Sequence, residues 1–321
     1  MLLKVSNLHV SIGKDKSKEV LNNINLELDS KEVIGIIGES GSGKSMTVKA
    51  LLGLLPRQAQ ITKGEVIYKD KDLVTFSDEE MRKLLGKEFG MIFQNSMTAL
   101  NPLIKVKHQV AEVIKKHNKD ISEKELNKQV EQLLREVNMP NIELSKEKYP
   151  HELSGGQKQR VLIAIAIANK PNILIADEAT TALDVTVQFQ IIRLLKSMLD
   201  KYEMSMIFIS HDLGLIRHVA NYIYIMYAGE ILERGEVMQI FTNPQHPYTK
   251  GLIRSLPEFA IKGEQIEVIP GRALSINEKE KGCPFYKRCN RRLEACLKEI
   301  HEVEIENKHF VKCINLGETH E

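Results

Sequence analysis

The sequence has almost no net charge and no long apolar segment. Lysine plus arginine exceeds aspartate plus glutamate by 45 − 43 = 2 residues, so the charge gives no reason to expect a nucleic-acid partner. The longest apolar run, eight residues at 161–168, is far shorter than the roughly 20 residues needed to cross a bilayer. The first residues lack the apolar segment of a secretory signal. These absences predict a soluble cytoplasmic protein that reaches a membrane only through partner chains.

Cysteine is absent from the first 282 residues. The four cysteines follow the pattern C-x5-C-x6-C-x16-C and are Cys283, Cys289, Cys296 and Cys313. In a cytoplasmic protein, clustered cysteines indicate a metal site before a disulfide. The pattern has no C-x2-C pair and is unlike an ordinary zinc finger, whereas four thiolates suffice for a [4Fe–4S] cluster. The alternatives are therefore an iron–sulfur cluster, a zinc ion, or reduced cysteines without metal.

Strand-like and helix-like segments alternate along the chain. Short strands are predicted at residues 2–12, 21–29, 172–177 and 204–210. Residues 77–170 are mainly helical in pattern, and a further helix is predicted at about 186–201. Such alternation predicts an α/β fold with a parallel sheet and helices on both faces. After Pro257 the sequence becomes charged and irregular, which places a domain boundary near residue 256.

A glycine-rich loop follows one of the short apolar strands. Its residues fit G-x-x-x-x-G-K-[ST] and are Gly38, Glu39, Ser40, Gly41, Ser42, Gly43, Lys44 and Ser45. The glycines let backbone N–H groups surround phosphates, and the helix that follows adds a positive dipole. In such a loop Lys44 contacts the β- and γ-phosphates, while the hydroxyl of Ser45 binds Mg²⁺. The sequence therefore predicts a nucleotide-binding loop.

Two further motifs carry groups suited to phosphate chemistry. The first is a pentapeptide made of Leu153, Ser154, Gly155, Gly156 and Gln157. It precedes an apolar helix, where a serine and two glycines form a second anion site. The second motif is an apolar strand that ends in Asp177 and Glu178. One carboxylate there can hold the water shell of a metal ion, and the other can polarise an attacking water.

Together these motifs resemble the ABC ATPase family, whose signature is the LSGGQ pentapeptide found here at residues 153–157. The resemblance implies a P-loop NTPase (RecA-like) core with an antiparallel β subdomain and a helical subdomain. To these the chain adds a short irregular C-terminal extension. ATP and Mg²⁺ are the implied ligands. In that family the signature contacts the γ-phosphate of ATP held by the opposite subunit.

The resemblance also assigns roles to single residues. Glu178 matches the catalytic base, Asp177 the Walker B aspartate, and His211 the switch histidine that contacts the γ-phosphate. Gln94 matches the Q-loop glutamine, which senses Mg²⁺ and the transmembrane partner. The magnesium ligands are therefore expected to be Ser45, Gln94 and Asp177.

Two positions depart from the family pattern. Family members usually stack adenine on an aromatic side chain near the N-terminus, but the matching stretch LHVSI ends in Ile12, with His9 nearby. Ala179 stands where the importer group usually has proline. The D-loop of the family matches residues 181–184.

The resemblance extends over nearly all of the chain and favours the oligopeptide, dipeptide and nickel importer branch. It is carried by NPQHPYTKGLIRSLP at residues 243–257 and by the cysteine-containing segment that follows. The branch implies an ATPase domain at 1–255, with a helical subdomain at about 95–165, and an extension at 256–321. The implied function is ATP hydrolysis that powers import of peptides, or of nickel or another metal chelate, through a permease.

The implied partners are a second, similar but distinct ABC ATPase, two transmembrane permease subunits and an extracellular substrate-binding protein, without nucleic acid. The chain would lie peripherally on the cytoplasmic face of the membrane. A soluble ABC ATPase outside transport is the first alternative, but it normally has paired nucleotide domains or a long coiled-coil insert. A degenerate regulatory subunit is the second, but it usually lacks the catalytic glutamate or histidine, whereas Glu178 and His211 are both present.

Overall fold

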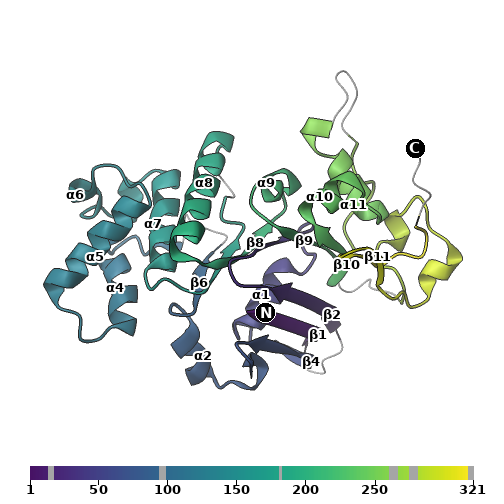
Figure 1. Cartoon of the computed structure of the whole chain (residues 1–321), viewed down its shortest axis with the longest axis horizontal. Helices are drawn as coiled ribbons and strands as arrows, with labels where there is room; N and C mark the ends of the chain where they lie inside the picture. Colours follow the sequence, from purple (N-terminus) through teal and green to yellow (C-terminus); the bar gives the residue numbers. More distant parts are fainter. Residues whose placement is uncertain (14–17, 94–98, 181–182, 260–266, 275–280, 317–321) are drawn as a thin grey trace. The chain divides into compact units, whose positions relative to one another are not determined.

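The computed structural model describes residues 1–13, 18–93, 99–180, 183–259, 267–274 and 281–316. The chain divides into two compact units, whose elements are labelled in Figure 1. The first unit comprises Met1–Asp29, Val33–Phe76 and Ile209–Glu321. The second unit comprises Ser30–Glu32 and Ser77–Phe208. Each unit is built from segments distant in the sequence, so packing rather than chain order decides which motifs share a unit.

An antiparallel sheet in the order β2-β1-β4-β5 forms one part of the first unit. Its strands are β1 (Leu3–Ile12), β2 (Lys18–Leu28), β4 (Ala59–Tyr68) and β5 (Lys71–Asp72). In β1, Val5 lies opposite Leu26 on one side and Val66 on the other, and all three side chains are buried. Alternating apolar residues thus cover one face of this sheet. The strands predicted at 2–12 and 21–29 are confirmed, whereas β4 was not predicted.

The second sheet of the first unit has β3 next to β9, followed by β10, β12 and β11. Its strands are β3 (Val33–Ile37), β9 (Tyr222–Tyr227), β10 (Glu230–Glu236), β11 (Val303–Glu306) and β12 (His309–Val311). β3 and β9 are parallel, and the later pairs are antiparallel. Every residue of β3 is buried, as expected for a parallel strand covered on both faces.

Short helices accompany these strands in the first unit. They are α1 (Lys44–Leu51), η1 (Leu73–Thr75), α9 (Leu213–Arg217), α10 (Val237–Thr242) and α11 (Pro247–Arg254). In α11, Pro247 occupies the first turn and His246 caps the helix by accepting a hydrogen bond from Tyr248 N. A proline in the first turn costs no intrahelical hydrogen bond, so this sequence starts the helix at a fixed point.

The second unit combines three strands with a group of helices. The strands are β6 (Phe89–Ile92), β7 (Ile173–Asp177) and β8 (Ser205–Ser210), of which β6 and β7 are parallel. The helices are α2 (Asp78–Leu84), α4 (Val106–His117), α5 (Glu123–Glu136), α6 (Ile142–Ser145), η2 (Pro150–Glu152), α7 (Gly155–Ile167) and α8 (Val185–Tyr202). The helix predicted at 186–201 is therefore confirmed as α8.

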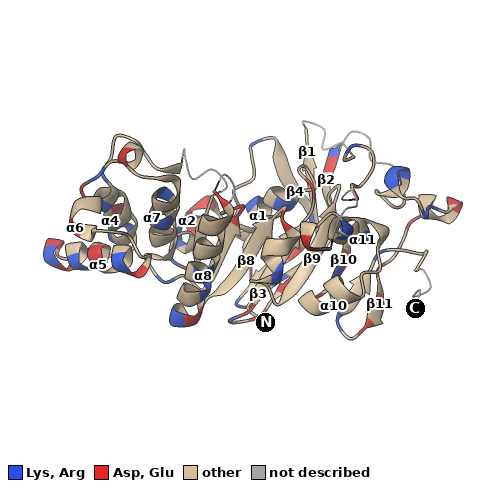
Figure 2. Cartoon of the chain, turned by 90° about the horizontal axis from the view of Figure 1, so that it is seen from above, with Lys and Arg blue, Asp and Glu red and all other residues tan. Residues whose placement is uncertain are grey.

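The helices α4, α5 and α7 pack on one another, as Figure 1 shows. α5 buries Leu126, Val130, Leu133 and Leu134, a helical spacing of four, three and one residues. Figure 2 shows charged residues along α5, whereas β8 carries none. Amphipathic patterns of this kind explain why the sequence of residues 77–170 predicts mainly helices. None of the described helices has both the length and the apolar character required to span a membrane.

The described part of the extension is irregular over most of its length. It contains the 3-10 turns η3 (Pro257–Phe259), η5 (Tyr286–Arg288) and η6 (Glu294–Leu297). It also contains β11 and β12, and β12 pairs with β10 so that Arg234 lies opposite Phe310. The extension thereby continues a sheet of the first unit. The domain boundary near residue 256 stays a prediction.

Candidate functional site

The glycine-rich loop connects β3 to α1, as predicted, and two of its glycines are required by geometry. A Cβ atom on Gly38 would lie 2.1 Å from the carbonyl oxygen of Met226 in β9, so no larger residue fits there. Gly43 has φ = 105° at the N-cap of α1, a left-handed conformation that glycine adopts without strain. The loop can therefore turn tightly against β9 and direct its backbone towards the N-terminus of α1.

Lys44 and Ser42 give the loop its polar lining. The side chain of Lys44 is buried, and its ammonium group donates hydrogen bonds to Gly38 O at 2.7 Å and Glu39 O at 3.0 Å. The hydroxyl oxygen of Ser42 is buried and has no hydrogen-bond partner among the described residues. A cation, an unused hydroxyl and a helix N-terminus at one loop suit a polyanion such as the phosphates of a nucleotide.

The carboxylates Asp177 and Glu178 lie at the end of β7 in the second unit. Asp177 is the last residue of the strand and is buried. Glu178 has φ = 48°, which is uncommon for a residue other than glycine. Such strained backbone is often found at functional sites. The strand therefore ends in a sharp turn that separates the two carboxylates, one buried and one half-buried.

The pentapeptide at 153–157 forms the start of α7. Ser154 is the N-cap, and its hydroxyl accepts a hydrogen bond from Gln157 N at 3.3 Å. In return, the side-chain oxygen of Gln157 accepts one from Ser154 N at 3.1 Å. This capping box fixes the direction of the helix and leaves the first-turn N–H groups of Gly155 and Gly156 outside the helical hydrogen-bond pattern. A second anion site at these groups stays a prediction.

The remaining predicted site residues lie in different parts of the chain. His211 directly follows β8, belongs to the first unit and is exposed. The next residue, Asp212, caps α9 by accepting hydrogen bonds from Gly214 N and Leu215 N. Gln94 and residues 181–182 of the predicted D-loop lie outside the described residues. The first unit thus holds the phosphate loop and His211, and the second holds the carboxylates and the pentapeptide.

His9, near the expected adenine-stacking position, is held within the antiparallel sheet. Its Nδ1 lies 2.6 Å from a carboxylate oxygen of Glu19, and its Nε2 lies 2.8 Å from the side-chain oxygen of Asn7. The ring is largely buried, so these two contacts fix its orientation. Adenine recognition at this position stays a prediction.

Comparison with known proteins decides the family. A profile described as "ABC transporter" matches residues 21–181, and one described as "Oligopeptide/dipeptide transporter, C-terminal region" matches residues 232–296. The chain belongs to the ABC transporter family. Both this membership and the predicted branch of the family are therefore confirmed.

Relatives of similar length resemble this ABC transporter chain over most of its length. The oligopeptide transport ATP-binding protein OppD of Bacillus subtilis is 43% identical over 97% of this chain and 88% of its own length. The dipeptide transport ATP-binding protein DppD of Lactococcus lactis is 41% identical over 97% of this chain and 90% of its own. Among solved structures, the ATP-binding cassette MJ0796, a dimer bound to ADP and phosphate, matches with a TM-score of 0.65 and 28% identity. The match covers 74% of this chain and 99% of that one. The predicted P-loop NTPase fold is confirmed.

The four cysteines of this ABC transporter chain lie in the first unit as free thiols, two buried and two half-buried. Cys283 N donates a hydrogen bond to Cys296 O at 2.8 Å. Burial raises the pKa of Cys283 to about 12, with a smaller contribution from the neighbouring cysteines. Burial also raises the pKa of Cys289 and of Cys313. The protein alone therefore favours protonated thiols, so a bound cation would have to stabilise the thiolates.

The four thiols are suitable metal ligands by type, but their arrangement is less suitable for holding a metal ion. Four thiols from one short segment are the ligand type of iron–sulfur and zinc sites. Within the described residues, however, no three His, Cys, Asp or Glu side chains are arranged to hold one metal ion. The structure therefore does not support a compact single-ion site.

Sequence reasoning missed two residues that contact the phosphate loop. The hydroxyl of Tyr248 in α11 accepts a hydrogen bond from Glu39 N at 3.0 Å. The guanidinium of Arg288, in the extension, pairs with the Glu39 carboxylate. Tyr248 lies within a segment that resembles the importer branch, which offered a weak signal. Arg288 lies in the cysteine-containing segment that also resembles this branch, but nothing in the sequence pointed to its contact with the loop.

Proposed function

We propose that this chain is the ATP-hydrolysing subunit of an importer that carries peptides across a membrane. One observation carries the proposal. Similarity to oligopeptide and dipeptide transport ATP-binding proteins extends over 97% of the chain, and a C-terminal region described for such transporters matches residues 232–296. The names of these relatives favour peptides over nickel or another metal chelate as cargo. They also disfavour a soluble ATPase outside transport and a degenerate regulatory subunit.

The phosphate loop binds ATP in this proposal. Its backbone N–H groups and the ammonium of Lys44 surround the phosphates, and the unused hydroxyl of Ser42 supports this role. Ser45, Gln94 and Asp177 would hold Mg²⁺, whose positive charge stabilises the phosphate oxygens.

Hydrolysis requires a base and a group that contacts the γ-phosphate. Glu178 accepts the proton of the attacking water, and His211 contacts the γ-phosphoryl group as it is transferred. The left-handed turn at Glu178 supports this assignment, because it sets the direction of that carboxylate at the strand end. Positioning and electrostatic stabilisation supply most of the catalysis in this class of reaction.

The signature acts on ATP bound to a second subunit. Ser154, Gly155, Gly156 and Gln157 would contact the γ-phosphate held by a similar but distinct ATPase, so that ATP closes the dimer. The segment after Gln94 passes this closure to two transmembrane permease subunits, and an extracellular binding protein delivers the peptide. The chain itself lies on the cytoplasmic face of the membrane.

Replacement of Glu178 by Gln in the assembled complex tests the function. The amide keeps the size of the side chain but cannot accept the proton, so ATP turnover should fall by at least about 100-fold while ATP still binds. Peptide uptake into vesicles that contain the complex should stop as well. Glu203→Gln is the matched control, because Glu203 is an exposed residue that pairs with Lys31 at the surface.

Three outcomes separate the alternatives. Turnover of Glu178→Gln within a few-fold of wild type shows that the base is assigned wrongly. Uptake of Ni²⁺ but not of peptide assigns the complex to metal import. A wild-type complex that binds ATP without hydrolysing it identifies a regulatory subunit.

For the extension we propose a [4Fe–4S] cluster on Cys283, Cys289, Cys296 and Cys313. The support is the confinement of all four thiols to one segment of one unit. Bound to these thiolates, the cluster would cross-link the irregular extension. Anaerobically purified protein should then be brown and contain about four iron and four sulfide per chain. Stoichiometric zinc, or no metal with an ordered extension, contradicts this proposal.

A further inference from the structure

An ion pair connects the extension to the phosphate loop within the first unit. Arg288 ends η5, immediately before Cys289. Its two terminal nitrogens contact the two carboxylate oxygens of Glu39, with Nη1–Oε2 at 2.6 Å and Nη2–Oε1 at 3.0 Å. Glu39 is the second residue of the phosphate loop. A two-point contact of this kind fixes both the distance and the orientation of the carboxylate.

The extension holds Arg288 in place for this contact. Its side chain is only 7% exposed, and its Nε donates to Pro270 O at 2.8 Å while Nη2 also reaches Ile269 O at 3.3 Å. Burial alone would lower the pKa of Arg288, but the hydrogen bonds to Glu39 and Tyr227 outweigh it and raise the pKa. The guanidinium therefore stays charged and is directed at Glu39 by backbone of the extension itself.

Glu39 is held at three points, and one of them is Lys44. Arg288 binds its carboxylate, the Tyr248 hydroxyl accepts from its N–H at 3.0 Å, and its carbonyl accepts from Lys44 Nζ at 3.0 Å. Glu39 thus contacts both the guanidinium of Arg288 and the ammonium of Lys44. Any shift of the Glu39 backbone changes the position of Lys44.

Aromatic packing docks the η5 turn beside this contact. The ring centroid of Phe285 lies 5.4 Å from that of Tyr227 and 5.2 Å from that of Tyr248, and the Tyr227 and Tyr248 rings are 4.8 Å apart. Arg288 lies over two of these rings, with its guanidinium carbon 5.7 Å from the centroids of Tyr227 and Phe285. The turn is therefore anchored to β9 and α11, and Arg288 projects from an ordered base.

We propose that Arg288 is a positioning residue of the ATP site, through which the extension completes the phosphate loop of its own subunit. This inference rests on the proposed ATPase function. Arg288 neutralises a carboxylate that would otherwise repel the phosphates, and it holds the loop backbone in the conformation that Lys44 and the N–H groups need. ATP affinity therefore depends on the extension.

Replacement of Arg288 by Met in the full-length chain tests this inference. The dissociation constant for ATP, measured by calorimetry, should rise about tenfold. In the assembled complex the KM for ATP should rise similarly, while kcat at saturating ATP stays within about twofold. Arg288→Lys should give an intermediate affinity, because a point charge neutralises Glu39 without holding it at two points. Should the methionine variant not fold, the lysine variant carries the test.

Glu39→Gln tests whether Arg288 affects ATP binding through Glu39 or in some other way. Without the carboxylate charge, the added effect of Arg288→Met should shrink to about twofold or less, because the two residues act on one interaction. The same tenfold loss in both backgrounds overturns the inference. A wild-type complex that does not hydrolyse ATP instead contradicts the proposed function, and the binding measurements on the chain still decide the role of Arg288.

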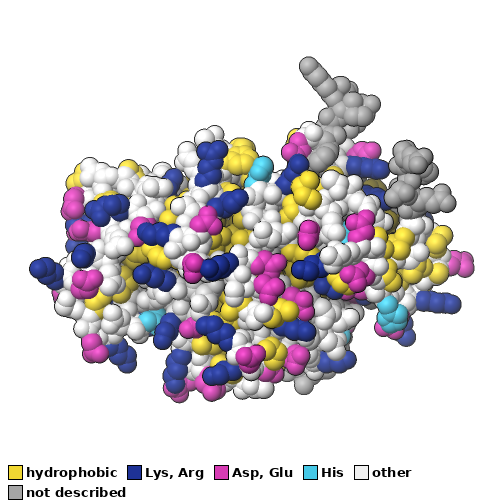
Figure 3. Space-filling view, in the orientation of Figure 1, with side chains coloured by type: hydrophobic (Ala, Val, Ile, Leu, Met, Phe, Trp, Pro, Cys, Tyr) yellow, Lys and Arg dark blue, Asp and Glu magenta, His cyan; other side chains and the backbone are white. Residues whose placement is uncertain are grey.

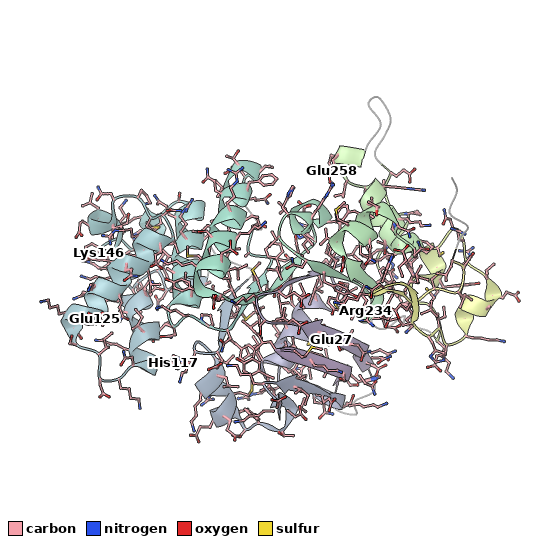
Figure 4. The ribbon with its side chains drawn as sticks, viewed as in Figure 1. Glu27, His117, Glu125, Lys146, Arg234 and Glu258 are labelled. Carbon is pink, nitrogen blue, oxygen red and sulfur yellow. The ribbon has the colours of Figure 1, made fainter. Side chains whose placement is uncertain are left out.

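A second two-point ion pair provides the matched control. Arg234, labelled in Figure 4, contacts Glu302 of the extension through Nε–Oε1 at 2.9 Å and Nη2–Oε2 at 2.7 Å. Neither residue belongs to the phosphate loop. Arg234→Met should therefore lower thermal stability without changing ATP affinity. If Arg288→Met behaves in the same way, Arg288 only fastens the extension, and the inference is wrong.

Discussion

A buried carboxylate in β10 joins three segments of the first unit, and its removal gives a large, testable loss of stability. Glu233 is fully buried and accepts hydrogen bonds from Gln245 N at 2.7 Å and His246 N at 2.8 Å, just before α11. It also lies 2.8 Å from His309 Nε2 in β12. An ionised carboxylate only accepts, so Nε2 carries the hydrogen. Glu233→Ala removes the acceptor of all three donors at once.

The size of the effect follows from these contacts. Each buried donor left without an acceptor costs about 1–3 kcal/mol, and Glu233 accepts from three such donors. We expect Glu233→Ala to lower the free energy of unfolding by about 4 kcal/mol, because the three donors share one cavity and partly relax together. At about 2–4 °C per kcal/mol, the unfolding temperature should fall by roughly 10 °C. Glu233→Gln keeps one acceptor and should lose about half as much.

Scanning calorimetry of the full-length chain measures this shift, and Glu27→Ala is the control. The Glu27 side chain is 48% exposed and lies 3.6 Å from Lys4, so its removal should cost about 1 kcal/mol or less. Figure 3 shows how both signs of charge are interspersed on one surface of the molecule, where such pairs contribute little. If Glu233→Ala and Glu27→Ala shift the transition equally, the three buried contacts do not stabilise the unit as argued.

Two further predictions concern the phosphate loop and the second unit. Lys44→Ala should weaken ATP binding about 10- to 100-fold, since a hydrogen bond to a charged group contributes about 1.5–3 kcal/mol; unchanged affinity by calorimetry contradicts the loop assignment. Burial lowers the pKa of His117, labelled in Figure 4, below its ordinary 6.5, and the charge of Lys116 lowers it further. The folded state therefore binds this proton less readily than the unfolded state, and stability falls as the pH drops through 6.5. His117→Gln should lose less stability between pH 7 and pH 5, and an equal loss in urea titrations contradicts the reasoning.

The elements that could be predicted from the sequence are those with local causes. The strand before Gly38 is an unbroken apolar run, and the loop after it needs glycine at specific backbone positions. Ser154 and Gln157 stand three residues apart, which is the spacing of a capping box. In such segments, the residues that satisfy a backbone conformation lie next to that conformation in the chain. Pattern alone was therefore enough for the phosphate loop, the signature helix and α8.

The elements that were missed depend on distant partners. β11 and β12 have four and three residues, and the alternating Val-Glu-Ile-Glu of β11 is largely exposed, so each segment is too short to be predicted as a strand from its own sequence. They are strands because β12 pairs with β10, which is more than 70 residues earlier in the chain. His309 is buried in contact with Glu233, 76 residues away in the sequence. Sequence patterns that are local cannot reveal a pairing of this separation.

The contact between Glu39 and Arg288 shows why a sequence motif predicts a binding loop but not the segments that can modulate it. The phosphate-loop motif specifies what the backbone needs, and Glu39 occupies one of its unspecified positions. A side chain at such a position is free to contact whatever segment the fold brings near. Here that segment is the cysteine-containing extension, which holds Glu39 at two points and, through its carbonyl, reaches Lys44. Because Arg288 directly precedes Cys289, any change that moves the cysteine segment also moves the group that neutralises Glu39. Glu39, which the motif leaves unspecified, is thus the residue through which the extension can alter ATP affinity.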